Sequence, residues 1–212
     1  MTAEAKRFEL QALREPCACG RAHDLAVRRI VLRRGALDAL PEVLRELGVF
    51  RKPTAVYDGH TYDAAGRRVR AALPACGSLV LPAAGLHADE HAVTLLEERL
   101  PADTDLLLAV GSGTLHDIVR YVAHGRGIPF LSVPTAASVD GFVSTVAAMT
   151  WRGVKVSSIA SSPAAVVADS AVFAAAPRRL TASGAGSSHP IAEFEDRDNW
   201  WKNRRVEFYL VK

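Results

Sequence analysis

Residues 105–122 have the sequence DLLLAVGSGTLHDIVRYV, and this stretch decides the fold that we expect. The uninterrupted apolar run Leu106–Val110 is typical of a parallel strand that is buried on both faces. Two glycines, Gly111 and Gly113, follow at once. Apolar residues then recur every three or four positions, as in an amphipathic helix: Leu115, Ile118, Val119 and Val122. The stretch therefore predicts a strand, a glycine turn and a helix, in that order.

The turn between this strand and this helix has the composition of an anion site. The start of a helix leaves several backbone N–H groups without partners and carries the positive end of the helix dipole. Glycine has no Cβ to block a phosphate oxygen, so a nucleotide pyrophosphate would fit there. We expect Thr114 to cap the helix or bond the phosphate, and Asp117 to lie in the first turn. An ordinary tight turn without a ligand is the alternative that this stretch alone leaves open.

The composition is that of a soluble globular protein, with 212 residues, 49% hydrophobic and 23% charged. The net charge of +3 comes from scattered basic pairs without aromatic residues between them, so no nucleic-acid partner is expected. No apolar run approaches the roughly 20 residues of a membrane helix, and the first residues lack the apolar core of a signal peptide. Three cysteines do not make a disulfide framework. We therefore expect a cytoplasmic protein without a membrane partner.

The rest of the chain alternates between strands and helices. Helices are expected from Gly35 to Gly48, from Gly59 to Leu73 and over residues 89–100. A β-hairpin is expected from residues 142–149 and 154–159, on either side of residues 150–153. Further strands are expected over residues 27–32, 53–58, 78–81, 128–134 and 163–169. This order predicts an α/β fold, a Rossmann-like parallel sheet flanked by helices, with a β-hairpin insertion.

Ligands of such sheets bind beyond the carboxyl ends of the strands. Asp58, the turn of residues 111–117 and the small-residue loop 134–140 all fall at that edge. Asp58 could accept hydrogen bonds from the ribose hydroxyls of an adenosine. In the dinucleotide fingerprint, however, the acidic residue lies about 20 residues after the glycines, and here that position falls near Val133. A helix or turn cap is the alternative for Asp58, and a plain turn is the alternative for the loop.

Several motifs together resemble the bacterial glycerol-1-phosphate dehydrogenases, which belong to the superfamily of iron-type alcohol dehydrogenases and dehydroquinate synthases. The motifs are CACGRAH, TAVYDGHTYDAAG, GSGTLHD, IPFLSVPTAASVDGFVS and SSPAAVVADSAVFAAAPRRL. Lys155 and Ser157 of the expected hairpin also match the family. These features agree with the family in order and spacing over about residues 15–186.

The resemblance implies interconversion of dihydroxyacetone phosphate, a small phosphorylated substrate, and sn-glycerol 1-phosphate with NAD or NADP. A divalent metal (Zn, Ni or Fe) polarises the substrate oxygen in the family. Carried over by position, Asp58 would hold the adenosine ribose, and the turn would hold the pyrophosphate. Thr135 and Ser138 would line the nicotinamide side, with Ser144 nearby, and Asp140 would contact the substrate. The implied cofactor-binding residues are Asp58, Gly111, Gly113, Thr114, Leu115, His116, Asp117, Thr135, Ser138 and Ser144.

The sequence departs from the family after residue 186. The family continues to a Gly-x-Gly-Asp, whose aspartate is a metal ligand, and two histidines from a following helical domain complete the site. Here Ser187 stands at the aspartate position, and His189 is the one histidine that follows. A catalytic metal takes about three protein ligands. We therefore expect no metal ligands and assign no catalytic residues, and we expect the family's C-terminal helical domain to be missing.

Two units follow from this comparison: an NAD(P)-binding domain over residues 1–186, and an unrelated charged tail over 187–212, interpreted as a truncation or fusion scar. Within the tail, residues 205–211 alternate weakly, as in an edge strand. We expect cofactor binding with little or no turnover. A glycerol dehydrogenase or dehydroquinate synthase-like member, a non-catalytic nucleotide-binding module and a fragment that does not fold are the alternatives. The sequence does not decide whether the cofactor is NAD or NADP, or whether the protein forms a homo-oligomer.

Overall fold

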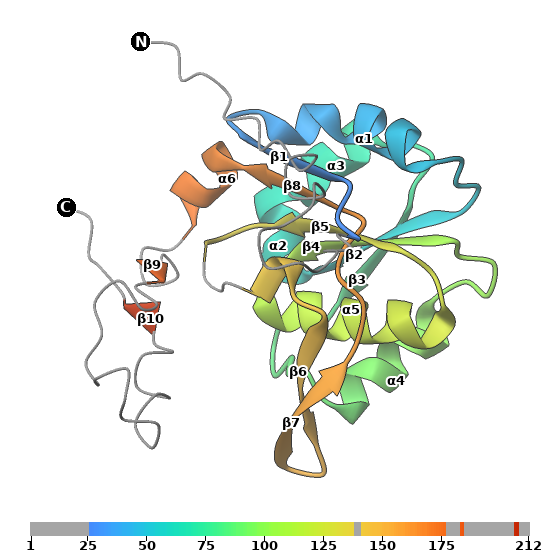
Figure 1. The fold of residues 1–212 in the computed structure, drawn as a ribbon, viewed down its shortest axis with the longest axis vertical. Helices are drawn as coiled ribbons and strands as arrows, with labels where there is room; N and C mark the ends of the chain where they lie inside the picture. Colours follow the sequence, from blue (N-terminus) through green and yellow to red (C-terminus); the bar gives the residue numbers. More distant parts are fainter. Residues whose placement is uncertain (1–25, 138–140, 177–182, 185–205, 208–212) are drawn as a thin grey trace, which may run out of the picture.

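The computed structural model of the chain describes residues 26–137, 141–176, 183–184 and 206–207. Its centre is a six-stranded sheet in which every pair is parallel, with the strand order β1-β8-β5-β4-β2-β3 (Figure 1). The strands are β1 (Arg29–Arg33), β2 (Pro53–Asp58), β3 (Gly77–Leu81), β4 (Leu106–Gly111), β5 (Phe130–Pro134) and β8 (Ala165–Asp169). The prediction of a Rossmann-like parallel sheet is confirmed.

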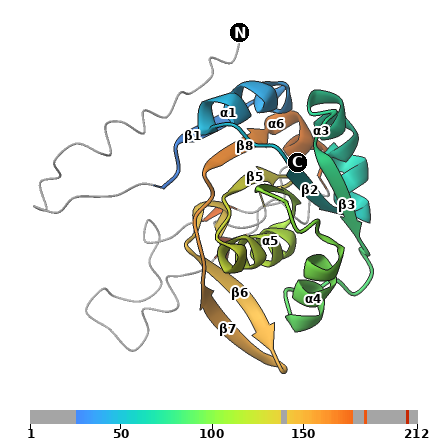
Figure 2. The same ribbon diagram turned by 90° about the vertical axis from the view of Figure 1, so that its right-hand side faces the viewer.

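Helices cover both faces of the sheet, which gives three layers (Figure 2). One face carries the 3-10 turn η2 (Ala36–Ala39) with α1 (Leu40–Leu47), α3 (Arg67–Ala72) and α6 (Ser170–Ala175). The other face carries α4 (Glu90–Arg99) and α5 (Gly113–Arg126). Among the described residues, no helix is long and apolar enough to cross a membrane.

Strand β4 lies inside the sheet and is buried along its whole length. Side chains of a strand point alternately to its two faces. Leu106, Leu108 and Val110 accordingly pack in the layer of α1 and α3. Leu107 and Ala109 pack in the layer of α4 and α5. The apolar run is therefore continuous because both of its faces lie in a core, as the sequence predicts.

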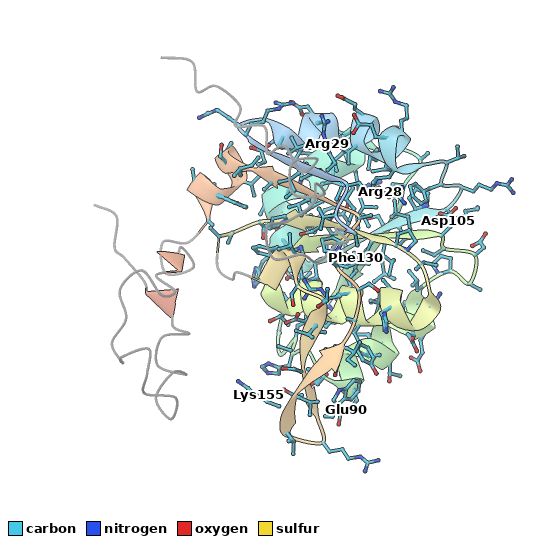
Figure 3. The ribbon with its side chains drawn as sticks, in the orientation of Figure 1. Arg28, Arg29, Glu90, Asp105, Phe130 and Lys155 are labelled. Atoms are coloured by element: carbon cyan, nitrogen blue, oxygen red, sulfur yellow. The ribbon has the colours of Figure 1, made fainter. Side chains whose placement is uncertain are left out.

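The hairpin insertion consists of β6 (Val146–Trp151) and β7 (Val154–Ile159), which pair antiparallel. Both residues of its turn, Arg152 and Gly153, have positive φ (49° and 80°), as in a type I′ turn. Buried Ala147 and Met149 pack the hairpin against the α4 and α5 layer. Figure 3 shows Lys155 on this hairpin, beyond the central sheet, and Oε1 of Glu90 accepts the N–H of Arg152 in the hairpin turn at 3.0 Å.

The predicted helix over residues 59–73 consists of three pieces: α2 (Gly59–Thr61), a π-helical turn η3 (Tyr62–Gly66) and α3. The π-helical turn brings Gly66 against aromatic rings. A Cβ on Gly66 would lie 2.6 Å from Cδ2 of Tyr62 and 3.1 Å from Cδ1 of Tyr57, so a larger residue does not fit. The sequence pattern predicts the helix but not the wider turn inside it.

The ends of several strands also differ from the prediction. The hairpin's first strand begins at Val146 and not at Phe142, because Gly141–Val143 forms a 3-10 turn, η4. The strands β1, β5 and β8 each begin two residues later than predicted. A further antiparallel pair joins β9 (Ser183–Gly184) and β10 (Val206–Glu207). The predicted domain boundary at residues 186 and 187 lies outside the described residues and stays a prediction.

Candidate cofactor site at the carboxyl edge of the sheet

The chain order reverses between β2 and β4. From β2 the chain proceeds to β3 on one side, and from β4 it proceeds to β5 on the other side, while β2 and β4 are direct neighbours. The connections after these two strands leave on opposite faces of the sheet, through η3 and α3 after β2 and through α5 after β4. In open α/β sheets, ligands bind at this kind of reversal, beyond the carboxyl ends of the strands. Asp58 and Gly111, the last residues of β2 and β4, lie there.

The N-terminus of α5 differs from the other helix starts at this edge. Asp58, Asp89 and Asp169 accept hydrogen bonds from backbone N–H groups at the starts of α2, α4 and α6. The N-cap of α5 is Ser112, and its side chain makes no capping hydrogen bond. The first bond of the helix joins the N–H of His116 to the carbonyl of Ser112. The N–H groups of residues 113–115 therefore have no acceptor among the described residues.

Gly111 allows α5 to start close to β4. A Cβ on Gly111 would lie 2.5 Å from Cδ2 and 3.1 Å from Cβ of Leu115, and Leu115 is fully buried. Gly111 is thus required because the helix packs closely against the strand at this point. Glycine allows the same close packing in dinucleotide-binding turns. Because the side chain of Leu115 belongs to the core, its backbone N–H is the group that it can offer a ligand.

The structure corrects two expectations about the turn. Of the two roles predicted for Thr114, the capping role is wrong, because the N-cap position is taken by Ser112, and the bond to the phosphate stays a prediction. Asp117 does not lie in the first turn, which contains no acidic residue. Asp117 lies one turn further along, where its carboxylate accepts a hydrogen bond from Arg120 at 3.3 Å. Burial raises the pKa of Asp117, and the neighbouring Arg120 guanidinium partly offsets that rise.

His116 is buried, and both ring nitrogens are used inside the protein. Its Nδ1 lies 2.8 Å from the carbonyl oxygen of Ser112, and its Nε2 lies 2.8 Å from Oγ of Ser132. A carbonyl only accepts, so Nδ1 carries the proton and Nε2 accepts from the Ser132 hydroxyl. Burial lowers the pKa of His116 to about 4, so the ring is neutral at pH 7. His116 therefore offers a ligand packing and not hydrogen bonds, and its predicted cofactor role stays a prediction.

Asp58 is both a cap and a group at the edge of the sheet. Its Oδ1 accepts the N–H of Thr61 at 2.9 Å, and the Thr61 hydroxyl accepts the Asp58 N–H at 2.9 Å. The capping alternative that the sequence left open is thus present. Its Oδ2 has no hydrogen-bond donor among the described residues. Asp58 is 8% exposed and is the last residue of β2, at the carboxyl edge of the sheet.

A cavity of about 200 Å³ lies between the start of α5 and the segment that leads into β6. It brings together four residues that the sequence predicted for the cofactor: Gly113, His116, Asp117 and Ser144. Thr135 lies beside them at the end of β5, where its N–H donates to the carbonyl of Gly111 at 3.1 Å. Ser138 and Asp140 lie outside the described residues. Their predicted roles stay predictions.

Arg120 also lines this cavity, and the sequence analysis did not predict it. It is 1% exposed, and its guanidinium lies 5.8 Å from the ring centroid of Phe130, labelled near the centre of Figure 3. Burial lowers the pKa of Arg120, and Asp117 opposes that shift. One feature of the sequence could have indicated Arg120. It follows Asp117 by three residues, the spacing of an ion pair within a helix, and it lies on the helix face that also carries the apolar residues.

The sequence profile described as iron-containing alcohol dehydrogenase matches residues 31–177. The chain belongs to this family. A glycerol-1-phosphate dehydrogenase (NAD(P)+) of Bacillus velezensis is 37% identical over 178 residues, which are 80% of this chain and 45% of that protein. The protein of the same name from Thermofilum pendens is 39% identical over 161 residues, 75% of this chain and 46% of that protein. The chain thus spans about half the length of the curated relatives it matches.

Solved structures agree with this family assignment. A probable glycerol dehydrogenase from Sinorhizobium meliloti has a TM-score of 0.61 and 26% identity, over 73% of this chain and 42% of that one. A sulfoacetaldehyde reductase from Bifidobacterium kashiwanohense, solved in complex with NAD+, has a TM-score of 0.59. Its identity is 16%, over 74% of this chain and 48% of that one, so this second likeness concerns the fold alone.

The name of the iron-containing alcohol dehydrogenase family implies a metal, which the described part of the chain does not fit. Within the described residues, no three His, Cys, Asp or Glu side chains gather as a metal site would require. Ser187 and His189, the positions that the sequence comparison considered for ligands, lie outside the described residues. The chemistry that can be derived from the described residues is therefore that of cofactor binding.

Proposed function

We propose that this chain binds NAD(H) or NADP(H) across the carboxyl edge of the sheet. The observation that carries the proposal is the uncapped start of α5, which lies at the reversal of the sheet order next to Asp58. A 14-residue helix directs its dipole at that point, and three N–H groups without an acceptor among the described residues are suited to the oxygens of a pyrophosphate. Asp58 is suited to the adenosine ribose, because its Oδ2 is available to accept from a hydroxyl group.

The order of the strands supports a direction for the dinucleotide. Strands β2, β4 and β5 are consecutive in the sheet, and neighbouring strands are about 4.8 Å apart. With the adenosine at the end of β2 and the pyrophosphate at the end of β4, the second nucleoside extends towards the end of β5. Thr135, the cavity and Ser144 lie on that side. They would border the nicotinamide, as the resemblance implies.

For the reaction, we infer hydride transfer between the nicotinamide and a secondary alcohol carbon, with dihydroxyacetone phosphate and sn-glycerol 1-phosphate as the substrate pair. The names of relatives at 34–39% identity support this choice. The glycerol dehydrogenase among the solved structures, at 26% identity, supports a non-phosphorylated substrate less strongly. Since the described residues do not fit a metal, we expect the chain to bind cofactor with little or no turnover.

Cofactor binding is tested with an NADH fluorescence titration of the purified chain and of Asp58→Asn. Asparagine still caps a helix but lacks the negative charge, so the substitution removes the strong acceptor and keeps the fold. We expect NADH to bind about tenfold more weakly, which is the loss of one charge-assisted hydrogen bond. Asp89→Asn, the same change at the start of α4, is the matched control and should bind like the wild type.

Turnover is tested by following NADH and NADPH oxidation with dihydroxyacetone phosphate, with and without added zinc or nickel. Glycerol and other alcohols in the reverse direction test the substrate choice. Absence of binding of either cofactor would refute the proposed site. Metal-dependent turnover by the chain alone would contradict the expectation that it lacks a working metal site.

A further inference from the structure

Arg120 carries a buried charge that the cofactor site as described does not use. It is 1% exposed, and among the described residues its one acidic partner is Asp117 at 3.3 Å, three residues earlier on the same helix. Its Nε has no hydrogen-bond partner among the described residues. Burying a guanidinium costs free energy unless its N–H groups donate to acceptors inside the protein. The acceptors of the two Nη groups therefore indicate what Arg120 does.

The other contacts of Arg120 go to two backbone carbonyls that delimit one loop. Its Nη1 donates to the carbonyl of Val146 at 2.6 Å, and its Nη2 donates to the carbonyl of Gly141. These carbonyls belong to the two ends of the segment 141–146, which contains η4 and leads into β6. A planar guanidinium directs donors to two acceptors at once, which a lysine ammonium does less well. Arg120 thus joins both ends of the loop to the middle of α5.

The same contacts extend to Ser144, the residue of this loop that the sequence predicted for the cofactor. The N–H of Ser144 donates to the carbonyl of Gly141 at 3.1 Å. Its hydroxyl donates to the carbonyl of Val146 at 3.1 Å and accepts the Val146 N–H at 3.0 Å. Both acceptors of Ser144 are therefore the carbonyls that Arg120 holds. The orientation of the Ser144 hydroxyl depends on the guanidinium through two shared oxygen atoms.

The loop also borders the start of α5. Phe142 packs edge-on against His116, with ring centroids 4.7 Å apart, and Ser144 and Gly113 line the same cavity. A loop held in this position forms a wall beside the end of β5, on the side where the second nucleoside of a bound dinucleotide would extend. A loop that moved away from α5 would leave that side open, while the end of β2 would not change.

We propose that Arg120 is a positioning residue that holds the loop 141–146 in place for the nicotinamide half of the cofactor, an inference that rests on the proposed function. It acts through the carbonyls of Gly141 and Val146 and does not itself contact the reacting atoms. Two consequences follow. Loss of the guanidinium frees the loop even without a ligand, and it weakens the binding of nicotinamide dinucleotides more than that of ligands that lack the nicotinamide.

The first arm of the test measures hydrogen–deuterium exchange of the ligand-free chain. Arg120→Met keeps the length of the side chain and removes its donors. The backbone N–H of Ser144 should exchange at least tenfold faster in this variant. Arg126→Met is the matched control, because Arg126 also donates to two carbonyls, of Glu97 and Pro101, from the same helix. It should leave the loop at its wild-type rate, and equal rates in both variants would overturn the proposal.

The second arm compares NADH with ADP-ribose, which contains the adenosine and the diphosphate but no nicotinamide. In Arg120→Met we expect NADH affinity to fall about tenfold and ADP-ribose affinity to stay within twofold of wild type. An equal loss for both ligands would assign Arg120 a merely structural role and overturn the proposal. Arg120→Lys keeps the positive charge but not the planar pair of donors, so its Ser144 exchange rate and its NADH affinity should lie between those of the wild type and Arg120→Met. If Arg120→Met fails to fold, Arg120→Lys is compared with the wild type instead.

The two arms separate the failure of this inference from that of the proposed function. A wild-type chain that binds neither NADH nor ADP-ribose overturns the cofactor site and the part of the inference that concerns the nicotinamide. The exchange experiment needs no ligand and still supports or overturns the contact between Arg120 and the loop. Binding of ADP-ribose and NADH with equal affinity by the wild type would also overturn the role of the loop.

Discussion

Gly111 and Leu115 approach so closely that an alanine at position 111 would place its Cβ 2.5 Å from Cδ2 of Leu115. The two residues define how α5 starts against β4. Leu115 is fully buried, so its side chain is not free to move aside as an exposed one would be. The N–H groups of residues 113–115, which have no acceptor among the described residues, therefore owe their position to the absence of a side chain at Gly111.

Gly111→Ala should therefore destabilise the chain by about 1–3 kcal/mol, the usual cost of overpacking a core. Urea unfolding at pH 7 measures the loss. The double variant Gly111→Ala/Leu115→Ala tests the cause, because removing the Leu115 side chain removes the clash as well as core contacts. It should cost less than the sum of the two single variants, and strictly additive costs would contradict the clash.

Asp169→Ala should be among the most destabilising single substitutions, at about 3 kcal/mol, because it removes one buried carboxylate that accepts from several donors at once. Asp169 is 1% exposed and accepts the N–H groups of Gly35 (3.0 Å) and Ala171 (2.9 Å) and the Arg68 guanidinium (2.9 Å). Thermal unfolding measures the loss. Asp105→Ala is a control with a similar geometry at an exposed place, since Asp105 accepts the N–H groups of Arg51 and Lys52. A loss no larger than that of the control would refute this account of Asp169.

The pH dependence gives Asp169 a second test. Burial alone would raise the pKa of Asp169, but the N–H groups of Ala171, Gly35 and Leu37 and the Arg68 guanidinium outweigh it, so that its pKa is lowered. A carboxyl group with a lowered pKa in the folded state stabilises the protein above its unfolded pKa of about 3.9, and this contribution is lost as the pH falls further. Asp169→Asn should remove that part of the acid sensitivity.

Much of this fold could be predicted because its signals are local. The apolar run 106–110 and the spacing of Leu115, Ile118 and Val122 predict a strand and a helix that the structure has at those places. Arg120 could not be predicted in the same way. Its acceptors are the carbonyls of Gly141 and Val146, more than 20 residues away, and a backbone carbonyl leaves no mark in the sequence. The N-cap positions of Asp58 and Ser112 similarly depend on where each helix begins, and a sequence pattern predicts the start of a helix less well than its existence.

His116 should make the chain less stable in mild acid. Its pKa is lowered to about 4 by burial, below the value of about 6.5 expected in the unfolded chain. The unfolded state therefore binds more protons between these values, and stability falls as the pH decreases from 6.5 to 4, by roughly 3 kcal/mol in total. His116→Gln keeps one donor and one acceptor but does not titrate. Urea unfolding at pH 7 and pH 4.5 should show a smaller difference for this variant, and an unchanged difference would refute the assignment.

Ser112→Asp should stabilise the chain and weaken cofactor binding at the same time. Ser112 is the N-cap of α5 but makes no capping bond with its side chain. A carboxylate there can accept one of the N–H groups that lack an acceptor in the described part of the chain, and it meets the positive end of the helix dipole. Together these contribute about 1 kcal/mol and raise Tm by a few degrees. The same charge would occupy the place of the pyrophosphate and repel it, so NADH affinity should fall by tenfold or more. Ser112→Asn separates the two effects, since it caps without charge and should weaken binding less. If Ser112→Asp binds NADH as tightly as the wild type, the pyrophosphate does not lie at the start of α5.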